Sequence, residues 1–449
     1  MTHRTNDRQP KAPALTHEAA PPAHLPGEFL VRFRPAALRA AMTFTRGPRD
    51  GFEAHRIAAA SSQALLMNHL HDRFGLRSVE PVFTLDPLHA LASRFASWQR
   101  ALARTVGDAL APGGEGFAIL RFPDGPGTDP RRLDRLLRNS EEIDLVEPVP
   151  ARWLSAPRRP DPALNRQWGL RAIRHFGARR TSAHRVPVAV IDSGIDRHHP
   201  LLPDSVVTRY DHDGLSPDDL EGHGTHVAGT IAALCDDLAG CSGIANCPLQ
   251  VWKVIDDRPM GDGRRYVAFA QYLRALAAVE TSGARVLNLS LGGTASSQTE
   301  TRLFRRLRAA DVFVVAAMGN ERELGDPVEY PAAYPGVHGV AAVDELDRDA
   351  PFSNTGRHAF LSAPGVNIVS TVPTSARSGP PFDTSSGTSM ATPHVAAVAA
   401  LVRARHPDWD VAQVAAHLAA TARPAAGQRA GKRSNTFGHG IVNQEDALR

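Results

Sequence analysis

Short, almost uninterrupted apolar segments alternate with helical patterns from about residue 167 onward, and this alternation constrains the fold more than any other feature. The strand-like runs occur at 188–191, 249–254, 285–289, 312–317 and 337–343. Apolar residues with helical spacing lie between them, at 223–234, 266–280 and 299–310. Strands that are apolar on both faces belong in a parallel sheet covered by helices on both sides. The sequence therefore predicts an α/β domain with a mostly parallel sheet over residues 166–449.

The part of the chain before this domain follows a different pattern. Strand-like segments and two helical segments alternate at 27–33, 61–74, 78–83, 115–122, 129–139 and 143–148. The order β-α-β-β-α-β predicts a ferredoxin-like α+β unit over residues 27–150, interrupted by an Ala/Leu/Arg-rich insert at 88–112. Residues 1–26 are polar and hold five prolines, so we expect a disordered tail. The prolines in 151–165 indicate an extended linker.

Charge and composition argue against several classes of protein. The chain has 51 Lys and Arg against 47 Asp and Glu, with the arginines interspersed among the acids, so we expect no nucleic-acid partner. No apolar run reaches the roughly 18 residues of a membrane helix, so we expect no membrane span. Residues 1–26 contain no apolar secretory signal. A cytoplasmic location is the default expectation, with secretion by another route left open.

Three further segments carry residue types that suit catalysis. In the first, an apolar strand-like run ends at Asp192, with Gly194 two residues later. In the second, His223 lies between two glycines at the start of an apolar helical segment. In the third, Ser389 lies among small residues that allow a sharp turn into a helix. Each has an ordinary explanation by itself, as a turn cap, a structural histidine or a helix cap. Their order along the chain, Asp then His then Ser, is the order of one known catalytic triad lineage.

The three segments read DSGID, HGTHVAG and GTSMATPHVA, and they resemble the signature motifs of the subtilisin-like serine proteases (subtilases) almost letter for letter. Residues 288–293 (NLSLGG) resemble the family's substrate-binding strand, and 317–320 (AMGN) resemble the segment with its oxyanion asparagine. The resemblance extends from about residue 167 to 440. It implies a subtilisin-like three-layer fold. The unit before it resembles, more weakly, the family's inhibitory propeptide.

The resemblance also implies a role for each matching residue. Ser389 would attack the scissile carbonyl, His223 would take up the proton, and Asp192 would orient the imidazole. Asn320 would stabilise the oxyanion together with the Ser389 N–H. This chemistry requires no metal or organic cofactor. The implied substrate-binding residues are Ser290, Leu291 and Gly292 on one edge, Gly261 and Gly263 on the other, and Gly319 and Glu329 near the pocket for the residue before the cut bond (P1).

Glu329 leaves two interpretations open. It matches the family position at the base of the P1 pocket, where a buried carboxylate would favour Lys or Arg. A side chain that points into solvent would have no such effect. The sequence does not decide between them.

A structural calcium ion is a weaker implication of the same resemblance. The loop 234–240 resembles the family's calcium loop, and Gln167 resembles another of its ligands. Leu201, however, stands where the family has an aspartate, which weakens a site that needs several oxygens. The chain has three cysteines, and a disulfide between Cys235 and Cys241 could brace the loop instead.

The sequence therefore predicts a serine endopeptidase that acts on protein or peptide substrates and is made as a zymogen with its own N-terminal prodomain as a partner. The candidate processing sites are Arg152, Arg158 and Arg159. Two alternatives remain open from the sequence. One is a non-catalytic peptide-binding module, and the other is a protease held latent by its prodomain that acts on one dedicated partner.

Overall fold

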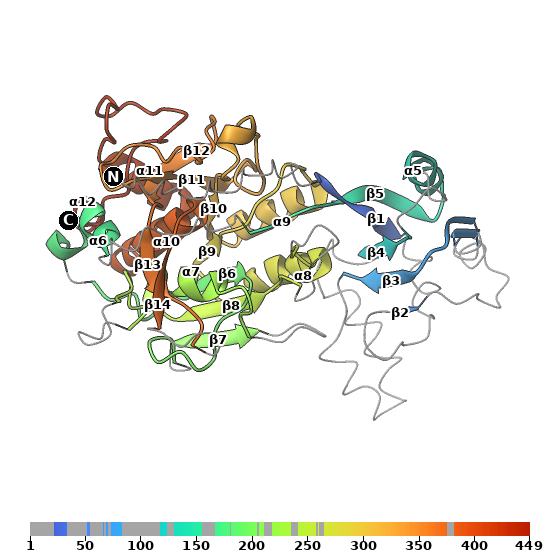
Figure 1. Ribbon diagram of the computed structural model, residues 1–449, viewed down its shortest axis with the longest axis horizontal. Coiled ribbons are helices and arrows are strands. Elements are labelled where there is room, and N and C mark those ends of the chain that lie inside the picture. Colours follow the sequence, from blue (N-terminus) through green and yellow to red (C-terminus); the bar gives the residue numbers. More distant parts are fainter. Residues whose placement is uncertain are drawn as a thin grey trace, which may run out of the picture.

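Figure 1 shows the computed structural model of the chain coloured along the sequence. The structure describes residues 22–33, 52–53, 66, 69–70, 73–82, 117–123, 130–154, 167–179, 181–203, 206–210, 218–234, 241–256, 259, 265–374 and 381–449. Most of the expected tail and the whole insert at 88–112 lie outside these residues.

A seven-stranded sheet forms the centre of the larger unit, and every strand pair in it is parallel. In spatial order the strands are β12 (Ala359–Pro364), β11 (Val337–Val343), β10 (Phe313–Ala317), β9 (Val286–Leu289), β6 (Val188–Asp192), β8 (Leu249–Lys253) and β7 (Val207–Tyr210). Five of them confirm the predicted strands. The two edge strands, VTRY and AFLSAP, were not predicted, because polar residues interrupt their apolar character.

The strand order reverses at β6, which lies between β8 and β9. In open parallel sheets, ligands bind beyond the carboxyl ends of the strands at such a reversal. Asp192 is the last residue of β6. The topology therefore places the first predicted catalytic residue where a parallel sheet offers a binding crevice.

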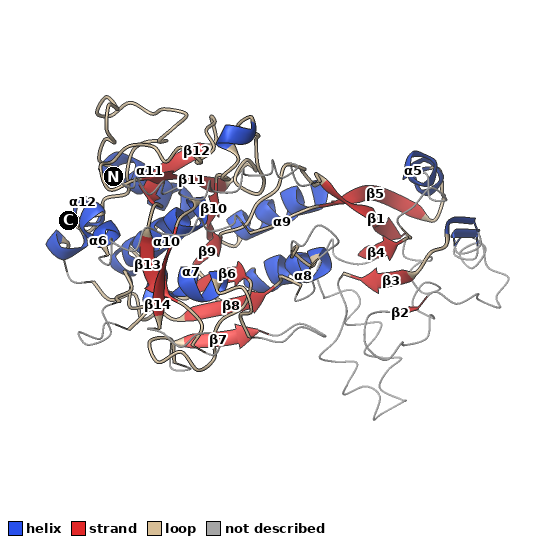
Figure 2. Cartoon of the chain, in the orientation of Figure 1, coloured by secondary structure: helices blue, strands red, loops and turns tan. Residues whose placement is uncertain are grey.

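Helices cover both faces of the sheet, as Figure 2 shows in blue. On one face lie α7 (His223–Ala232) and α10 (Thr388–Arg405), which share a core with Val188 and Val190. On the other face lie α8 (Phe269–Val279) and α9 (Gln298–Ala309), in a core with Ala189 and Ile191. Alternate side chains of β6 thus enter opposite cores, which confirms the predicted three-layer arrangement.

The remaining elements of this unit are short or peripheral. They are α6 (Trp168–Ala172), the 3₁₀ helices η1 (His175–Gly177) and η2 (Arg322–Leu324), the antiparallel pair β13 (Ile368–Thr371) and β14 (Phe382–Ser385), α11 (Val411–Thr421) and α12 (Gln444–Ala447). Within the described part of the chain, no helix combines the length and apolar character that crossing a membrane requires.

The N-terminal unit is a separate five-stranded sheet. Its spatial order is β2 (Phe52–Glu53), β3 (Ser78–Pro81), β4 (Phe117–Arg121), β1 (His24–Phe33) and β5 (Ile143–Pro150), all antiparallel, with α5 (Pro130–Arg138) between β4 and β5 in the chain. The order β3-β4-β1-β5 is that of a split βαβ plait. The first strand begins at His24, three residues earlier than its sequence pattern indicated, because His24 pairs with Pro150 and Leu25 is buried.

One face of this N-terminal sheet packs against the larger unit at the end where α8 and α9 lie (Figure 1). Leu30, Ile119 and Val149 belong to the same apolar core as the buried residues of α8 and α9. The Glu147 carboxylate accepts hydrogen bonds from Ser297 Oγ at 2.6 Å and Gln298 N at 3.0 Å. A carboxylate at this position is favourable because backbone N–H groups at a helix start lack partners within the helix. The N-terminal unit therefore caps α9.

Candidate active site

Asp192 and His223 meet at the carboxyl edge of the central sheet. Asp192 ends β6 and His223 begins α7. His223 Nδ1 lies 2.8 Å from Asp192 Oδ1, and both side chains are buried. Burial lowers the pKa of His223, but the charge of Asp192 and its hydrogen bond outweigh burial, so the pKa is raised above its usual value. This contact fixes the ring orientation and stabilises a protonated imidazole.

Ser389 lies in the first turn of α10, and α10 packs against α7. Its hydroxyl donates to the Ser290 carbonyl oxygen at 3.0 Å, and Ser290 Oγ donates to the Ser389 carbonyl oxygen at 2.9 Å. Among the described residues, the buried His223 Nε2 has no hydrogen-bond partner. The structure thus joins His223 directly to Asp192 but turns the Ser389 hydroxyl toward Ser290. Catalytic hydrogen bonds are often incomplete in the absence of substrate.

Asn320 follows β10 and contacts the same turn. Its amide oxygen accepts hydrogen bonds from the backbone N and the hydroxyl of Thr388, both at 2.9 Å. The amide therefore has one orientation, with Nδ2 as the remaining donor. A Cβ atom on Gly387 would lie 3.0 Å from this Nδ2. The amino group accordingly lies beside the turn that carries Ser389.

Asp219 is a site residue that the sequence analysis missed. Its buried carboxylate accepts hydrogen bonds from Ser193 Oγ at 2.8 Å and from the backbone N of Gly222 and of Thr225, both at 2.8 Å. It thereby caps the start of α7 and connects it to the residue after Asp192. Burial raises the pKa of Asp219, while hydrogen bonds from Thr225 and Ser193 oppose that effect. An acid three residues before a helix-capping glycine was the available signal.

Residues 151–154 occupy the neighbouring cleft as an added strand. Trp153 N donates to Gly292 O at 3.0 Å, and Gly292 N donates to Trp153 O at 3.2 Å. On its other side Trp153 pairs antiparallel with Tyr266, and Val267 N donates to Arg152 O at 3.0 Å. Extended peptides bind to exposed sheet edges through main-chain hydrogen bonds of this kind. These four residues of the predicted linker are therefore held in the cleft.

The predicted edges of this cleft are only partly described. Gly292 lies against Trp153, and Ser290 and Leu291 precede it on the same edge. Gly261 and Gly263 lie outside the described residues, and the opposite edge that the structure describes is at Tyr266 and Val267. A Cβ atom on Gly293 would lie only 2.1 Å from Ala151 O, so this edge needs glycine for close approach.

Glu329 lies between two of the predicted substrate-binding glycines. Its side chain is 1% exposed, so it does not point into solvent. A Cβ atom on Gly292 would lie 2.4 Å from Oε2, and one on Gly319 would lie 2.1 Å from Oε1. Oε1 accepts a hydrogen bond from Asn354 at 3.0 Å, whereas the buried Oε2 has no partner among the described residues. Burial raises the pKa of Glu329 well above its usual value, and the neighbouring carboxyl of Glu321 raises it further.

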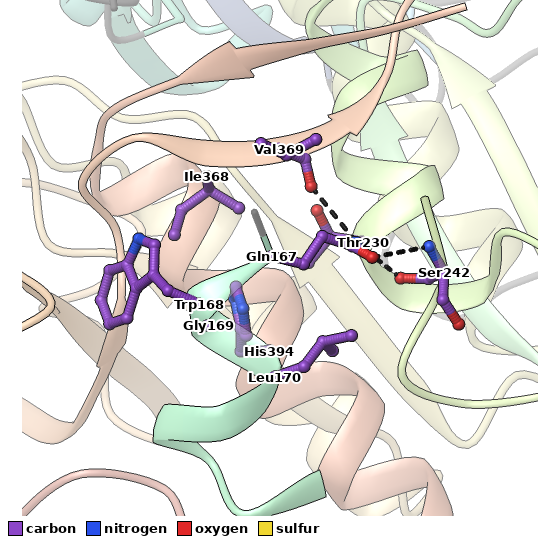
Figure 3. Close-up of a pocket in the computed structure, with 9 residues that line it drawn as sticks. All are labelled: Gln167, Trp168, Gly169, Leu170, Thr230, Ser242, Ile368, Val369 and His394. Atoms are coloured by element: carbon purple, nitrogen blue, oxygen red, sulfur yellow. Dashed lines mark hydrogen bonds between the residues drawn. The ribbon is translucent and has the colours of Figure 1, made fainter. Parts of the chain in front are cut away.

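The region expected to bind calcium is shown in Figure 3. Gln167 clamps the chain at Ser242: its amide oxygen accepts from Ser242 N at 2.8 Å, and Nε2 donates to Ser242 O at 2.9 Å. Residues 235–240 lie outside the described residues. The described part contains no cluster of three His, Cys, Asp or Glu residues that could hold a metal ion. The Gln167 oxygen is thus already engaged by a peptide N–H, and the described residues do not form a calcium cage.

The thiol of Cys241, which the sequence offered for a disulfide with Cys235, is free and buried in the structure. Cys235 itself lies outside the described residues. Burial raises the pKa of Cys241 to about 12, which keeps the thiol protonated at neutral pH.

The fold and the site are those of a peptidase. Its candidate nucleophile, Ser389, lies in the first turn of α10. A model of the subtilase family (Peptidase_S8) matches residues 183–440. The chain belongs to the subtilase family, and it is a serine endopeptidase.

Individual relatives agree with this assignment. Subtilisin BL of Lederbergia lenta is 37% identical over 285 residues, which covers 63% of this chain and 98% of that protein. Subtilisin E of Bacillus subtilis (strain 168) is 37% identical over 266 residues, covering 58% of this chain and 65% of that protein. The structure of fervidolysin from Fervidobacterium pennivorans, a keratinolytic enzyme related to subtilisin, aligns with a TM-score of 0.69 at 24% identity. That alignment covers 95% of this chain and 61% of the fervidolysin chain, and supports the fold.

Proposed function

We propose that Ser389, His223 and Asp192 form the catalytic triad and that the chain is a self-processing zymogen. The observation that carries this proposal is the buried contact between His223 Nδ1 and Asp192 Oδ1, at 2.8 Å, next to helix α10, which has Ser389 in its first turn. The proposal requires the Ser389 hydroxyl to turn from the Ser290 carbonyl oxygen to His223 Nε2. That nitrogen is the acceptor that the described residues leave unpaired.

The reaction then follows from these atoms. Ser389 Oγ attacks the scissile carbonyl carbon while its proton passes to His223 Nε2, and Asp192 stabilises the imidazolium that results. The carbonyl oxygen becomes an oxyanion that accepts hydrogen bonds from Asn320 Nδ2 and the Ser389 N–H. His223 returns the proton to the leaving amine, and the peptide bond breaks. Water hydrolyses the acyl-enzyme by the same steps in reverse order. Every step uses protein groups and requires no cofactor.

The experiment compares the full-length chain with its Ser389→Ala variant on a casein plate. We expect a clearing zone from the native chain and none from the variant. The matched control is Ser385→Ala, a half-buried serine of β14 in the same segment, which should clear like the native chain. Equal clearing by Ser389→Ala would contradict the triad, and clearing by neither protein would favour a non-catalytic peptide-binding module.

The pH dependence of hydrolysis tests His223. A general base must be neutral, and the pKa of His223 is raised, so activity should fall as the pH drops through a value above 6.5. The measurement is kcat/KM against pH with an uncharged peptide. An acid limb centred well below 6.5 would contradict the assignment of His223 as the base.

The zymogen proposal is supported by residues 151–154, which occupy the cleft as a bound peptide would. Trp153 lies opposite Gly292, and a peptide that continued this antiparallel register by two residues would reach Ser290, the residue hydrogen-bonded to Ser389. We therefore expect the self-cut after Ser155. Of the three arginines considered from the sequence, Arg152 has its side chain against Glu300, and Arg158 and Arg159 lie outside the described residues. N-terminal sequencing of the processed protein should begin at Ala156, and a start upstream of Ala151 would contradict the register.

A P1 preference for Arg or Lys is supported by Glu329. Its buried, partly unpaired carboxylate lies against Gly292 and Gly319, and a cationic side chain would supply the missing partner.

A calcium ion in the loop 234–240 also stays a prediction. An unchanged melting temperature in the presence of a chelator would count against it.

A further inference from the structure

A polar surface pocket of about 360 Å³ lies where α6 meets the turn after β11 and the segment after α11. The side chains that line it include Trp168, Arg171, Arg174, Glu345, Asp347 and Arg423. Figure 1 shows α6 at the opposite end of the molecule from the sheet of β1 to β5. None of the lining residues contacts the strand 151–154, so this pocket is separate from the cleft.

Arg423 forms a fixed wall of the pocket. Its Nη1 and Nη2 lie 2.5 and 2.6 Å from the two carboxylate oxygens of Asp347, and its Nε donates to Ala172 O at 2.9 Å. A bidentate pair of this kind fixes both side chains, and the two charges compensate each other. The wall therefore positions the turn after β11 against α6.

Arg171 and Arg174 have more freedom to bind a ligand. Both are exposed, and Arg171 forms no ion pair with the part of the chain that the structure describes. Arg174 Nη1 lies 3.8 Å from the carboxylates of Glu445 and Asp446, and these two acids lie closer to Arg449, at 3.0 and 2.8 Å. Exposed charges at such separations contribute little to stability. The two guanidinium groups thus keep N–H donors for another partner.

Two lining residues have an unusual backbone conformation. Arg174 has φ +58° and ψ +38°, and Asp347 has φ +62°. This left-handed region is unfavourable for residues with a Cβ atom, above all for a long side chain such as arginine. Glycine would adopt the same turn at lower cost. Residues held in such conformations gather at binding sites, which makes the guanidinium of Arg174 a candidate for ligand binding.

The charges of the pocket indicate the class of its ligand. Three arginines line it against two acids, which leaves one positive charge. Because Arg423 and Asp347 compensate each other, this charge belongs to Arg171 and Arg174 opposed by Glu345. One carboxylate would neutralise it and would match the fork of a guanidinium. A phosphate with two negative charges would exceed it and would be repelled by Glu345.

Two large apolar side chains next to the pocket are strongly exposed. Phe176 is 74% exposed and follows Arg174 by two residues, and Leu346 is 61% exposed and stands between the two lining acids. Exposed apolar groups beside a polar site mark interaction surfaces and require apolar groups on the partner. A peptide with an acidic residue between apolar ones combines both chemistries, whereas an isolated anion has only one of them.

We propose that this pocket is a second peptide-binding site, which holds an acidic residue with apolar neighbours in a segment of a partner protein. Arg171 and Arg174 bind the carboxylate, and Phe176 and Leu346 contact the apolar neighbours. The site goes beyond peptide hydrolysis and does not depend on the triad. Because it lies away from the N-terminal unit, it is accessible while residues 151–154 fill the cleft. The chain can therefore hold a partner before its cleft opens.

The test measures binding without cleavage. Full-length Ser389→Ala chain is titrated into labelled Gly-Leu-Phe-Glu-Leu-Phe-Gly or the same peptide with Gln for Glu, and fluorescence anisotropy gives each Kd. We expect the Glu peptide to bind about tenfold or more tightly than the Gln peptide, as for a charge-assisted hydrogen bond. Adding Arg171→Gln and Arg174→Gln should reduce the difference to within about twofold. Arg179→Gln, at an exposed arginine outside the pocket, is the matched control and should keep it.

A second variant separates binding from folding. Arg174→Gly should weaken binding of the Glu peptide without lowering the melting temperature, because glycine adopts the left-handed turn readily. A lower melting temperature would show that Arg174 is a structural residue and would overturn its place in the site. Equal Kd values for the two peptides would overturn the proposal, and so would binding of inorganic phosphate or phosphatidylserine vesicles in place of the peptides. Each of these outcomes leaves the protease assignment intact.

Discussion

Two buried glutamates line the cleft of this protease, and their surroundings differ in one respect. Glu300 is ion-paired with Arg152 from the chain's own N-terminal part. Glu329 has a hydrogen bond from Asn354 on one oxygen and no described partner on the other. Both carboxyls have raised pKa values because of burial, but Arg152 opposes this effect more strongly at Glu300.

The difference distinguishes a filled subsite from an unfilled one. The strand 151–154 presents Arg152 to Glu300, whereas Glu329 Oε2 has no hydrogen-bond partner among the described residues. A strand that fills one pocket and leaves the other open can hold the cleft without making the contact at Glu329 that we propose for a good substrate.

The largest expected effect is a difference in how much the two glutamates contribute to the free energy of unfolding. Glu300→Ala, made in the inactive Ser389→Ala chain, should lower the free energy of unfolding by about 3–5 kcal/mol, because Arg152 stays buried without a partner. Glu329→Gln in the same background should change it by about 1 kcal/mol or less, since it relieves an unpaired carboxylate. Denaturant unfolding measures both. Similar losses for the two variants would remove the distinction between them.

Selectivity at P1 should depend on Glu329 and not on Glu300. Glu329→Ala should lower the ratio of kcat/KM for P1 Arg over P1 Leu by about tenfold to a hundredfold, the value of a charge-assisted hydrogen bond. Glu323→Ala, at an exposed position of the same loop, serves as the control and should keep the native ratio. An unchanged ratio in Glu329→Ala would contradict the proposed preference for Arg or Lys at P1.

The pH dependence of stability and of P1 preference tests Glu329 further. The pKa of Glu329 is raised in the folded protein, so the contribution of this group to stability is present below its unfolded pKa and is lost as pH rises through its folded pKa. Thermal unfolding of the Ser389→Ala chain should therefore show a loss relative to Glu329→Gln as pH rises. Over the same range the preference for P1 Arg should increase, because the carboxylate ionises.

The smallest expected effect concerns the influence of Glu321 on Glu329. The Glu321 carboxyl raises the pKa of Glu329, so Glu321→Gln should shift the pH-dependent rise in P1 Arg preference to lower pH. The change should be smaller than the loss seen with Glu329→Ala, because burial is the larger cause. The ratio of P1 Arg to P1 Leu cleavage, measured across pH, reports it directly. A shift to higher pH would contradict this reading of the pair.

The sequence predicted the features of the fold that are encoded locally. The five apolar strands and the helices that begin near His223 and Thr299 follow from side-chain periodicity, and the structure confirms them. The edge strand β7 escaped prediction because VTRY has only four residues and two adjacent polar ones at its centre. The early start of β1 at His24 depends on pairing with β5, far away in the chain.

Within the site, prediction worked where one motif carries the residue and failed where two distant segments meet. Asp192 and His223 each stand in a distinctive motif, and the structure brings them into contact. Whether Glu329 is buried depends on Gly292 and Gly319 around it, which no local pattern shows. The pair of Arg152 and Glu300 joins residues 148 positions apart, so neither could be distinguished from an ordinary surface charge.

The burial of Arg152 also bears on timing. Its guanidinium is completely enclosed, so the N-terminal unit can leave only when a charge is drawn out of the Glu300 pocket into water. Escape from within one molecule is a first-order event whose half-life does not depend on enzyme concentration. The interval between folding and the first cleavage of another protein would then be set by the lifetime of this one ion pair.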